Sequence, residues 1–310
     1  MYKVFIDGQA GTTGLRLEQR LAERADIELI AIKEEYRKDK DARLGCIADA
    51  DLVFLCLPDK EAADIAAAAD AAACPIIDCS TAHRTAGGWA YGMPELFGDL
   101  KSFTRLSNPG CHATGFIMSV RPLVDAGILD PGADICCHSL TGYSGGGKAM
   151  IAEYEAAGMA PRQYALPQEH KHLPEMHKYS GLEKIPVFSP IVCDYYCGML
   201  VSMPLPRGAL RSGATAEAVR EALAARYESC PFVKVRAAGD EFSDAAGAGY
   251  LSADAFAGRD DIEIFVTGKD DKIVIVSRYD NLGKGASGAA VQNMNILFGL
   301  PEETGLVLGA

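Results

Sequence analysis

Along the first 110 residues, short apolar runs and longer amphipathic stretches follow one another, which predicts strands that alternate with helices. Short, nearly continuous apolar runs are typical of buried parallel strands, and each is followed by a glycine-rich turn or an amphipathic stretch. The strand-like runs and the helical stretches lie within 3–24, 27–33, 50–58, 60–74 and 75–80. This alternation predicts an α/β fold with a doubly wound parallel sheet.

The pattern changes after residue 110. Residues 113–127 have helical periodicity and end at a glycine, and 214–229 have it again. The segments between are rich in β-branched residues and have the length of strands; they lie within 134–148, 185–206, 231–238 and 262–283. A last helix is expected within 285–300, with apolar positions at 290, 291, 294 and 297. We therefore expect a second domain of mixed α+β structure.

The bulk composition narrows the function classes. The chain has 310 residues, of which 49% are hydrophobic and 23% charged, with a net charge of −12. A nucleic-acid surface needs a basic face, so this charge argues against one. No apolar run approaches the roughly 18–20 residues of a membrane span, and the first residues do not resemble a signal peptide, so we predict a cytoplasmic protein without a membrane partner.

Ten cysteines are spread along the chain without any CxxC pair, which argues against a zinc ribbon and against a thioredoxin-type motif. In such a chain most cysteines are expected to be reduced and packed as small hydrophobic residues. One position differs. Cys111 follows Pro109 and Gly110 at the predicted corner between a turn and a helix, and we ask whether its thiol carries chemistry.

Gly8, Gly11 and Gly14 follow the first predicted strand and open a helix. At such a corner, backbone N–H groups can approach a pyrophosphate at the positive end of the helix. The spacing is GxxGxxG rather than GxGxxG, and a tight turn without a ligand is the alternative. The position at the first strand–helix corner favours dinucleotide binding.

The end of the second predicted strand bears on which dinucleotide binds. Glu34 and Glu35 could hold a ribose 2′-hydroxyl, as in NAD sites. Basic residues crowd the same corner, namely Lys33, Arg37, Lys38 and Lys40. In an acidic chain this cluster favours a 2′-phosphate and hence NADP, while a solvated charged loop is the alternative.

A thiol at a helix start gains thiolate character from the helix dipole, and the same N–H groups can hold an oxyanion. A base is needed as well. His112 adjoins Cys111 but is expected to point elsewhere. His170 and His172 lie on one side of an extended segment with Glu169 and Glu175 nearby, so a carboxylate could orient one of them. As a metal pair the two lack an obvious third ligand, and no metal is predicted.

A second glycine-rich loop, "TGYSGGGK", contains Ser144 and Gly145 and ends at Lys148. Backbone amides and one ammonium make a cradle for a phosphate or carboxylate, with a flexible hairpin as the alternative. A thiol, a base, an anion loop and a dinucleotide site together indicate acyl or aldehyde redox chemistry through a thioester.

These motifs, read in order, resemble the short form of the N-acetyl-γ-glutamyl-phosphate reductase family of arginine biosynthesis. The matching blocks run nearly from end to end: "GQAGTTG", "VFLCLP", "IIDCSTAHR", "YGMPEL", "SNPGCHATG", "HKHLPEM" and the long "DNLGKGASGAAVQNMNILFGLPEETGL". Two departures stand out. His83 occupies a place where the family commonly has an aromatic residue, and Lys148 one where longer forms carry arginine, so bidentate anion recognition there is in doubt.

The resemblance implies a Rossmann domain for NADP, made of residues 1–110 and 286–310, and a glyceraldehyde-phosphate-dehydrogenase-like domain, 111–285, that also forms a homodimer or homotetramer. It implies that Cys111 is the nucleophile and that His170, or His172 in its place, is the base. The implied cofactor residues are Gly8, Ala10, Gly11, Thr12, Thr13, Gly14, Lys33, Arg37, Ser80, Asn281 and Lys284. The implied substrate residues are Asn108, Ser144, Gly145, Lys148 and His172.

Other functions remain open at this point. A phosphorylating dehydrogenase of the aspartate-semialdehyde type would use the same chemistry on a shorter substrate. A thiol hydrolase or acyltransferase could bind a nucleotide for regulation only, and a dinucleotide sensor would need no thiol at all. Substrate preference distinguishes the aspartate-semialdehyde type from the reductase, and turnover without NADPH would identify the hydrolase or acyltransferase.

Overall fold

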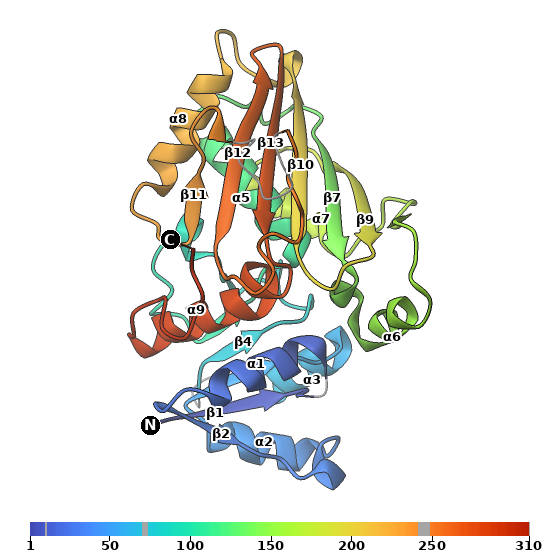
Figure 1. The fold of residues 1–310 in the computed structure, drawn as a ribbon. Helices are drawn as coiled ribbons and strands as arrows, with labels where there is room; N and C mark the ends of the chain where they lie inside the picture. Colours follow the sequence, from blue (N-terminus) through green and yellow to red (C-terminus); the bar gives the residue numbers. More distant parts are fainter. Residues whose placement is uncertain (10, 70–73, 241–248, 310) are drawn as a thin grey trace. The chain divides into compact units, whose positions relative to one another are not determined.

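The computed structural model describes all residues except 10, 70–73, 241–248 and 310. The chain forms two compact units (Figure 1). The first unit contains residues 1–109 and 286–306, and the second contains residues 110–285 and 307–310. The first unit is therefore built from two separate stretches of the chain, with the last helix added to the N-terminal part.

The first unit is organised around a six-stranded sheet in the order β2-β1-β3-β4-β6-β5, and all paired strands run parallel. The strands are β1 (Tyr2–Asp7), β2 (Ile27–Ile30), β3 (Leu52–Leu55), β4 (Ile76–Asp78), β5 (Ala90–Tyr91) and β6 (Arg105–Ser107). Because β1 lies between β2 on one side and β3 on the other, the chain first winds to one edge of the sheet and then back towards the other edge. The predicted doubly wound parallel sheet is confirmed.

Helices cover both faces of this sheet. They are α1 (Thr12–Ala22), α2 (Lys40–Ala48), α3 (Asp59–Ala68), α4 (Pro94–Phe97) and α9 (Gly288–Phe298). Side chains alternate between the faces along each strand. In β3, Phe54 packs with residues of α1 and α9, whereas Leu55 packs with residues of α2 and α3. Two apolar clusters, one on each face, hold the layers together.

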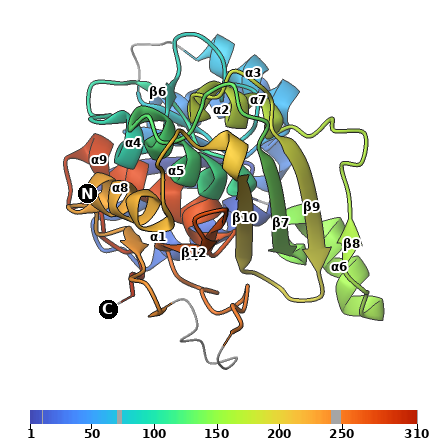
Figure 2. The ribbon, with the colours of Figure 1, turned by 90° about the horizontal axis from the view of Figure 1, so that it is seen from above.

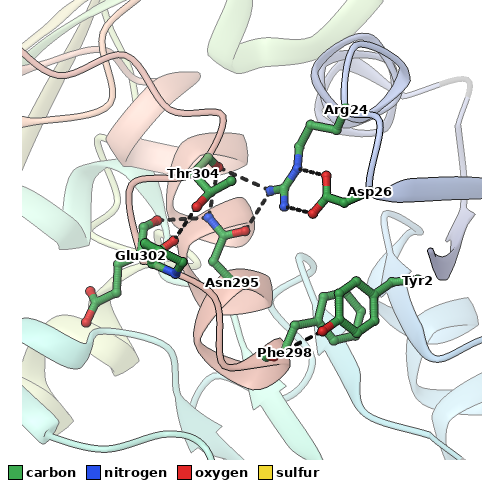
Figure 3. Close-up of polar contacts among 8 residues, drawn as sticks. Tyr2, Arg24, Asp26, Asn295, Phe298, Glu302 and Thr304 are labelled. Carbon is green, nitrogen blue, oxygen red and sulfur yellow. Dashed lines mark hydrogen bonds and ion pairs between the residues drawn. The ribbon is translucent and has the colours of Figure 1, made fainter.

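A buried arginine holds the C-terminal stretch onto the first unit (Figure 3). Arg24 donates from Nη1 to Asn295 Oδ1 at 2.6 Å and to the Thr304 carbonyl at 3.1 Å, and its Nη2 lies 2.6 Å from Asp26 Oδ2. Asn295 Nδ2 donates to the carbonyls of Glu302 and Thr304, each at 2.9 Å. These hydrogen bonds join residues that are far apart in sequence, and they fix the segment after α9 in place.

The second unit contains a mixed seven-stranded sheet in the order β11-β12-β13-β10-β7-β9-β8. Its strands are β7 (Cys136–Gly142), β8 (Arg162–Gln163), β9 (Val187–Cys193), β10 (Met199–Pro206), β11 (Val233–Val235), β12 (Ile262–Lys269) and β13 (Lys272–Tyr279). Most neighbours are antiparallel, while β7–β9 and β11–β12 are parallel pairs. The expectation of a mixed α+β second domain is confirmed.

The helices of the second unit are α5 (Cys111–Asp125), α6 (Gly147–Ala157), α7 (Leu173–Ser180) and α8 (Ala216–Tyr227). In Figure 1, α5 and α7 lie behind this sheet, α8 lies to its left and α6 lies below β9; Figure 2 shows β10, β7 and β9 side by side. The central helix, α5, contacts β10, β13, α7 and α8 and is buried along most of its length. Within the described part of the chain no helix combines the length and apolarity of a membrane span.

Candidate active site

Cys111 is the first residue of α5, and Gly110 in extended conformation precedes it as the N-cap. The predicted helix start at the thiol is confirmed. The thiol is partly exposed, so it is not sealed in the apolar core, and the first turn of the helix contains no acidic residue. A position at the positive end of a 15-residue helix favours the thiolate.

Two histidines approach this thiol from different elements. Cys111 Sγ and one ring nitrogen each of His112 and His172 all lie within 4.8 Å of one another. His172 is the N-cap residue of α7 and is buried. His170 packs against His172: its ring centre is 4.7 Å from that of His172, and its Nδ1 accepts the His172 backbone N–H at 3.1 Å. A ring nitrogen of His172 thus lies close to the thiol sulfur.

The ring of His112 does not point away from the thiol as expected, but both of its nitrogens are engaged. Nδ1 lies 2.7 Å from Ser139 Oγ, and Nε2 lies 2.7 Å from the Tyr164 hydroxyl. Burial lowers the pKa of His112 to about 3, so the ring is neutral at ordinary pH. A metal ion bound by Cys111, His112 and His172 would have to displace one of these hydrogen bonds. We therefore interpret the cluster as a thiol and its base.

Three further groups shape the corner around the thiol. Glu175, in the first turn of α7 and 1% exposed, accepts the Gly110 backbone N–H at 3.1 Å. The buried Tyr279 hydroxyl donates to the Cys111 carbonyl at 2.6 Å and accepts the Gly115 N–H at 3.1 Å. A Cβ added to Gly285 would lie 3.0 Å from Cys111 Cβ. The helix start is thus held by α7, β13 and the segment that follows β13.

The glycine turn of the first unit has the backbone that a pyrophosphate cradle needs. Gly8 has φ +94°, and a Cβ there would lie 2.3 Å from the Cys56 carbonyl oxygen. A Cβ on Gly14 would lie 2.4 Å from the Gly8 carbonyl oxygen. Gly11 donates its N–H to the Gly8 oxygen at 3.0 Å, and Ala10 lies outside the described residues. Side chains at Gly8 and Gly14 are excluded by backbone atoms.

Two buried polar atoms at this turn have no hydrogen-bond partner among the described residues. Within the described part of the protein, the buried Thr12 Oγ1 makes no hydrogen bond, and neither does Asp7 Oδ2 at the end of β1. A hydroxyl at the first turn of α1 can donate to a phosphate oxygen. Thr13 follows it in the same helix and is partly buried. These residues fit a dinucleotide phosphate.

Asp7 is almost fully buried, and its Oδ1 lies 3.3 Å from Arg43 Nε. Burial outweighs this ion pair and raises the pKa of Asp7 from 3.8 to about 6. Since the folded protein then holds the proton more tightly than the unfolded chain, the contribution of Asp7 to stability falls as pH rises from about 4 to about 6. At pH 7 the buried carboxylate costs roughly 1–3 kcal/mol.

We therefore expect Asp7→Asn to be more stable than the native protein at pH 7, by roughly 1–3 kcal/mol in unfolding free energy. The gain should shrink towards zero as the pH falls from about 6 to about 4. Urea unfolding of both proteins across this range measures it. A variant that is less stable than the native protein at pH 7, with a loss that shrinks as the pH falls, would show that the Arg43 ion pair outweighs desolvation.

The other predicted cofactor residues of the first unit lie at loops after strands. Lys33 and Arg37 flank a short 3₁₀ helix, Glu34–Tyr36, after β2; both are exposed, and Arg37 Nε lies 2.9 Å from Glu34 Oε1. Ser80 follows β4 and donates from its N–H and its hydroxyl to Asp78, at 2.9 and 2.8 Å. These positions agree with a ligand at the carboxyl edge of the sheet.

The predicted substrate loop forms a 3₁₀ turn, Tyr143–Gly146, that leads into α6. Ser144 is buried and accepts from Asn281 Nδ2 at 3.1 Å, and Asn281 Oδ1 accepts the Gly198 N–H at 2.9 Å. Gly145 and Lys148 are exposed. The structure thus brings Ser144 together with Asn281, a residue predicted for the cofactor.

Two predicted ligand residues have structural partners. Asn108, 2% exposed, donates to the Ala286 carbonyl at 2.9 Å and accepts from Asn293 at 3.3 Å, so it joins β6 to the returning C-terminal stretch. Lys284 is also buried, and its Nζ lies 4.9 Å above the Phe232 ring. We expected both to face ligands, and these contacts give each a role in holding the fold.

Comparison with known proteins places the chain in a family. Residues 111–281 match the semialdehyde dehydrogenase dimerisation domain, and residues 32–101 match the semialdehyde dehydrogenase NAD-binding domain. N-acetyl-gamma-glutamyl-phosphate reductase 2 of Nostoc sp. is 43% identical over 319 residues, covering 98% of this chain and 99% of the relative. The reductase of Sinorhizobium fredii is 41% identical over 95% of this chain and 98% of its own. The chain belongs to the N-acetyl-gamma-glutamyl-phosphate reductase family.

Membership confirms the resemblance drawn from the sequence and with it an NADP-dependent oxidoreductase of the Rossmann type. Solved structures share the fold. Aspartate semialdehyde dehydrogenase II of Vibrio cholerae, complexed with ASA, superimposes with a TM-score of 0.71 at 17% identity, over 96% of this chain and 98% of that chain. The enzyme from Francisella tularensis gives 0.71 at 15% identity, over 96% and 100%.

Sequence reasoning missed three residues that are distant in sequence but bond to Cys111 or His112, namely Ser139, Tyr164 and Tyr279. Each is a single polar residue in a strand or loop, and none belongs to a recognisable motif. Glu175 was noted only as a possible partner of a histidine, whereas its carboxylate accepts the N–H of the N-cap residue before Cys111. A signal existed for Glu175 alone, through its spacing of three residues from His172.

Proposed function

We propose that this protein reduces N-acetyl-L-glutamyl 5-phosphate with NADPH to N-acetyl-L-glutamate 5-semialdehyde and phosphate, through a thioester on Cys111, as a step of arginine biosynthesis. The observation that carries the proposal is the partly exposed thiol at the start of α5, with a ring nitrogen of His172 within 4.8 Å, in a chain of this reductase family. Relatives that bear this name span the chain nearly from end to end.

Cys111 begins the reaction as a thiolate that attacks the acyl carbon of the substrate, and phosphate leaves as the thioester forms. Backbone N–H groups of the first turn of α5 stabilise the oxyanion of the tetrahedral intermediate. When bound in the first unit, NADPH would supply the hydride for reduction of this thioester to the thiohemiacetal. The sulfur then leaves the thiohemiacetal, so the thiolate is regenerated as the semialdehyde forms.

His172 moves the protons of this cycle. Its ring is the one that combines proximity to the thiol with a position at the start of α7, and His112 is held neutral by burial with both nitrogens bonded. We therefore assign the base to His172 in place of His170. His170 accepts the His172 N–H and acts as a positioning residue for it.

The first unit holds the cofactor. Gly8, Gly11 and Gly14 let the turn approach the pyrophosphate, and Thr12 and Thr13 add hydroxyl donors at the helix start. Lys33 and Arg37 supply positive charge for the 2′-phosphate. We assign Ala10 and Ser80 to the same site from the family pattern, and Asn281 and Lys284 to the nicotinamide end.

The substrate's anionic groups are assigned to the second unit. Exposed Lys148 and the Gly145 backbone at the start of α6 can bind a phosphate or carboxylate, and Ser144 is fixed in place by Asn281.

A match to a dimerisation domain over residues 111–281 supports a homo-oligomer, and we propose a homodimer or homotetramer. The ten cysteines are free thiols, which supports a reducing compartment such as the cytoplasm.

The reverse reaction tests this assignment. We expect the native protein to reduce NADP with N-acetylglutamate semialdehyde only when phosphate is present, and with a kcat/KM at least about 100-fold above that for aspartate semialdehyde, because an active site shaped for one chain length rejects another. Equal or greater activity on aspartate semialdehyde would favour the shorter-substrate enzyme. Ester hydrolysis without NADP turnover would favour a thiol hydrolase.

A further inference from the structure

Cys56 and Cys79 lie on the same face of the parallel sheet, directly after two neighbouring strands. Along β3 and β4, Phe54 and Ile77 pack in the apolar cluster that α1 and α9 cover. Each cysteine follows its apolar residue by two positions, so both side chains point to that same face. Both side chains pack against the same cluster, and as whole residues Cys56 and Cys79 are partly exposed.

The register brings the two cysteines side by side. Leu55 of β3 pairs with Asp78 of β4, and the cysteines are the next residue of each strand. The Cys79 N–H donates to the Leu55 carbonyl at 2.9 Å. Neighbouring strands lie about 4.8 Å apart, within the range of about 4.4–6.8 Å between Cα atoms that disulfides span. A hydrogen bond with the Cys79 thiol, together with burial, raises the pKa of Cys56.

The pair also touches the turn that we assign to the cofactor. The Cys56 N–H donates to the Asp7 carbonyl at 2.7 Å, and a Cβ on Gly8 would lie only 2.3 Å from the Cys56 oxygen. On the other strand Ser80 follows Cys79 directly. A shift of the Cys56 backbone would therefore move Gly8, and a shift of the Cys79 backbone would move Ser80.

We propose that Cys56 and Cys79 form a modification site: an oxidisable thiol pair that closes to a reversible disulfide and thereby weakens binding of the dinucleotide. The oxidant is a small-molecule disulfide. The Cys79 thiolate attacks one sulfur of it and expels one small thiolate, which takes up a proton. The Cys56 sulfur, losing its own proton, then displaces the second small thiol. Two protein thiols are oxidised, and one small disulfide is reduced to two thiols.

The effect on the cofactor follows from the shorter bond. A disulfide places its sulfurs about 2.05 Å apart, so they approach by roughly 1.5 Å relative to a thiol–thiol hydrogen bond. Because the Cys56 N–H is bonded to the Asp7 carbonyl and a Cβ on Gly8 would lie 2.3 Å from the Cys56 oxygen, we expect a movement of the Cys56 backbone to displace the turn. This consequence rests on the proposed function, whereas the formation of the disulfide does not.

The test uses the full-length protein with Cys111→Ser, so that the nucleophile does not react with the oxidant. After treatment with oxidised glutathione, digestion without reductant should yield a peptide pair joined through Cys56 and Cys79. The Kd for NADPH, followed by its fluorescence, should rise about tenfold and return after dithiothreitol. Bound NADPH should slow the oxidation, because coupling between two sites is reciprocal.

Matched variants separate this pair from other thiols. Cys56→Ala and Cys79→Ala, each made separately, should abolish the response, while Cys46→Ser, which removes another partly exposed thiol of the same unit, should keep it. Glutathione attached to one cysteine without a cross-link, or a cross-link that leaves the Kd unchanged, overturns the proposal. If the reduced protein does not bind NADPH, the proposed function fails, and the mass measurement still decides whether the pair is oxidised.

Discussion

Replacing Cys111 by serine is expected to remove phosphate-dependent NADP reduction almost completely, by about 10⁴- to 10⁶-fold in kcat. A serine hydroxyl at the helix start is far less ionised than a thiol, and an ester on it accepts hydride less readily than a thioester. The remaining groups of the corner would still bind substrate. The measurement is the reverse reaction with N-acetylglutamate semialdehyde, followed by NADPH absorbance.

The control for this variant is Cys136→Ser, which changes another partly exposed cysteine of the second unit. Its activity should stay within about threefold of the native value, as for a substitution away from the reacting atoms. Binding of NADPH should persist in Cys111→Ser, because the glycine turn belongs to the first unit. Turnover that survives the loss of the thiol would exclude Cys111 as the nucleophile and with it the thioester.

The glycine turn and the helix start at Cys111 were predictable because each depends on local chemistry. Gly8 and Gly14 stand where the backbone itself leaves no space for a side chain, and such a requirement appears in the sequence as glycine. The same holds for Cys111, which follows proline and glycine at the corner where α5 begins. A short motif is enough wherever neighbouring residues determine the structure.

The surroundings of the thiol were not predictable because they depend on long-range packing. Tyr279 reaches Cys111 from a strand that ends 168 residues later, and Tyr164 reaches His112 across 52 residues. Neither contact leaves a periodic or spaced signal. Asn108 was assigned a ligand role because it lies in the nucleophile block; its hydrogen bonds to Ala286 and Asn293 of the returning stretch leave no signal in the sequence either.

The choice between the two histidines of the "HKHLPEM" block required the fold. Both were candidates on sequence grounds, since alternate residues of an extended segment share a face. The helix α7 begins immediately after His172, so His172 is its N-cap residue. His170 lies two residues before the N-cap, outside the helix. Burial follows the same order, with His172 4% exposed and His170 more accessible.

His172→Gln is therefore expected to lower kcat by about 10²- to 10⁴-fold, the usual contribution of a general base. The same substitution at His170 should cost less than about tenfold, because its ring positions His172 through one hydrogen bond. The pH dependence of kcat separates a base from a structural residue: the acidic limb should disappear or move in His172→Gln and stay in place in His170→Gln. His112, with a pKa of about 3, cannot provide that limb.

The alkylation rate of Cys111 gives a readout that does not depend on turnover. Iodoacetamide reacts with the thiolate, so removing the base should slow alkylation at neutral pH in His172→Gln and leave it nearly unchanged in His170→Gln. Equal losses of kcat in both variants, with unchanged alkylation in both, would assign the two histidines to substrate binding. Loss confined to His170→Gln would restore His170 as the base and require the segment before α7 to bring the His170 ring to the thiol during catalysis.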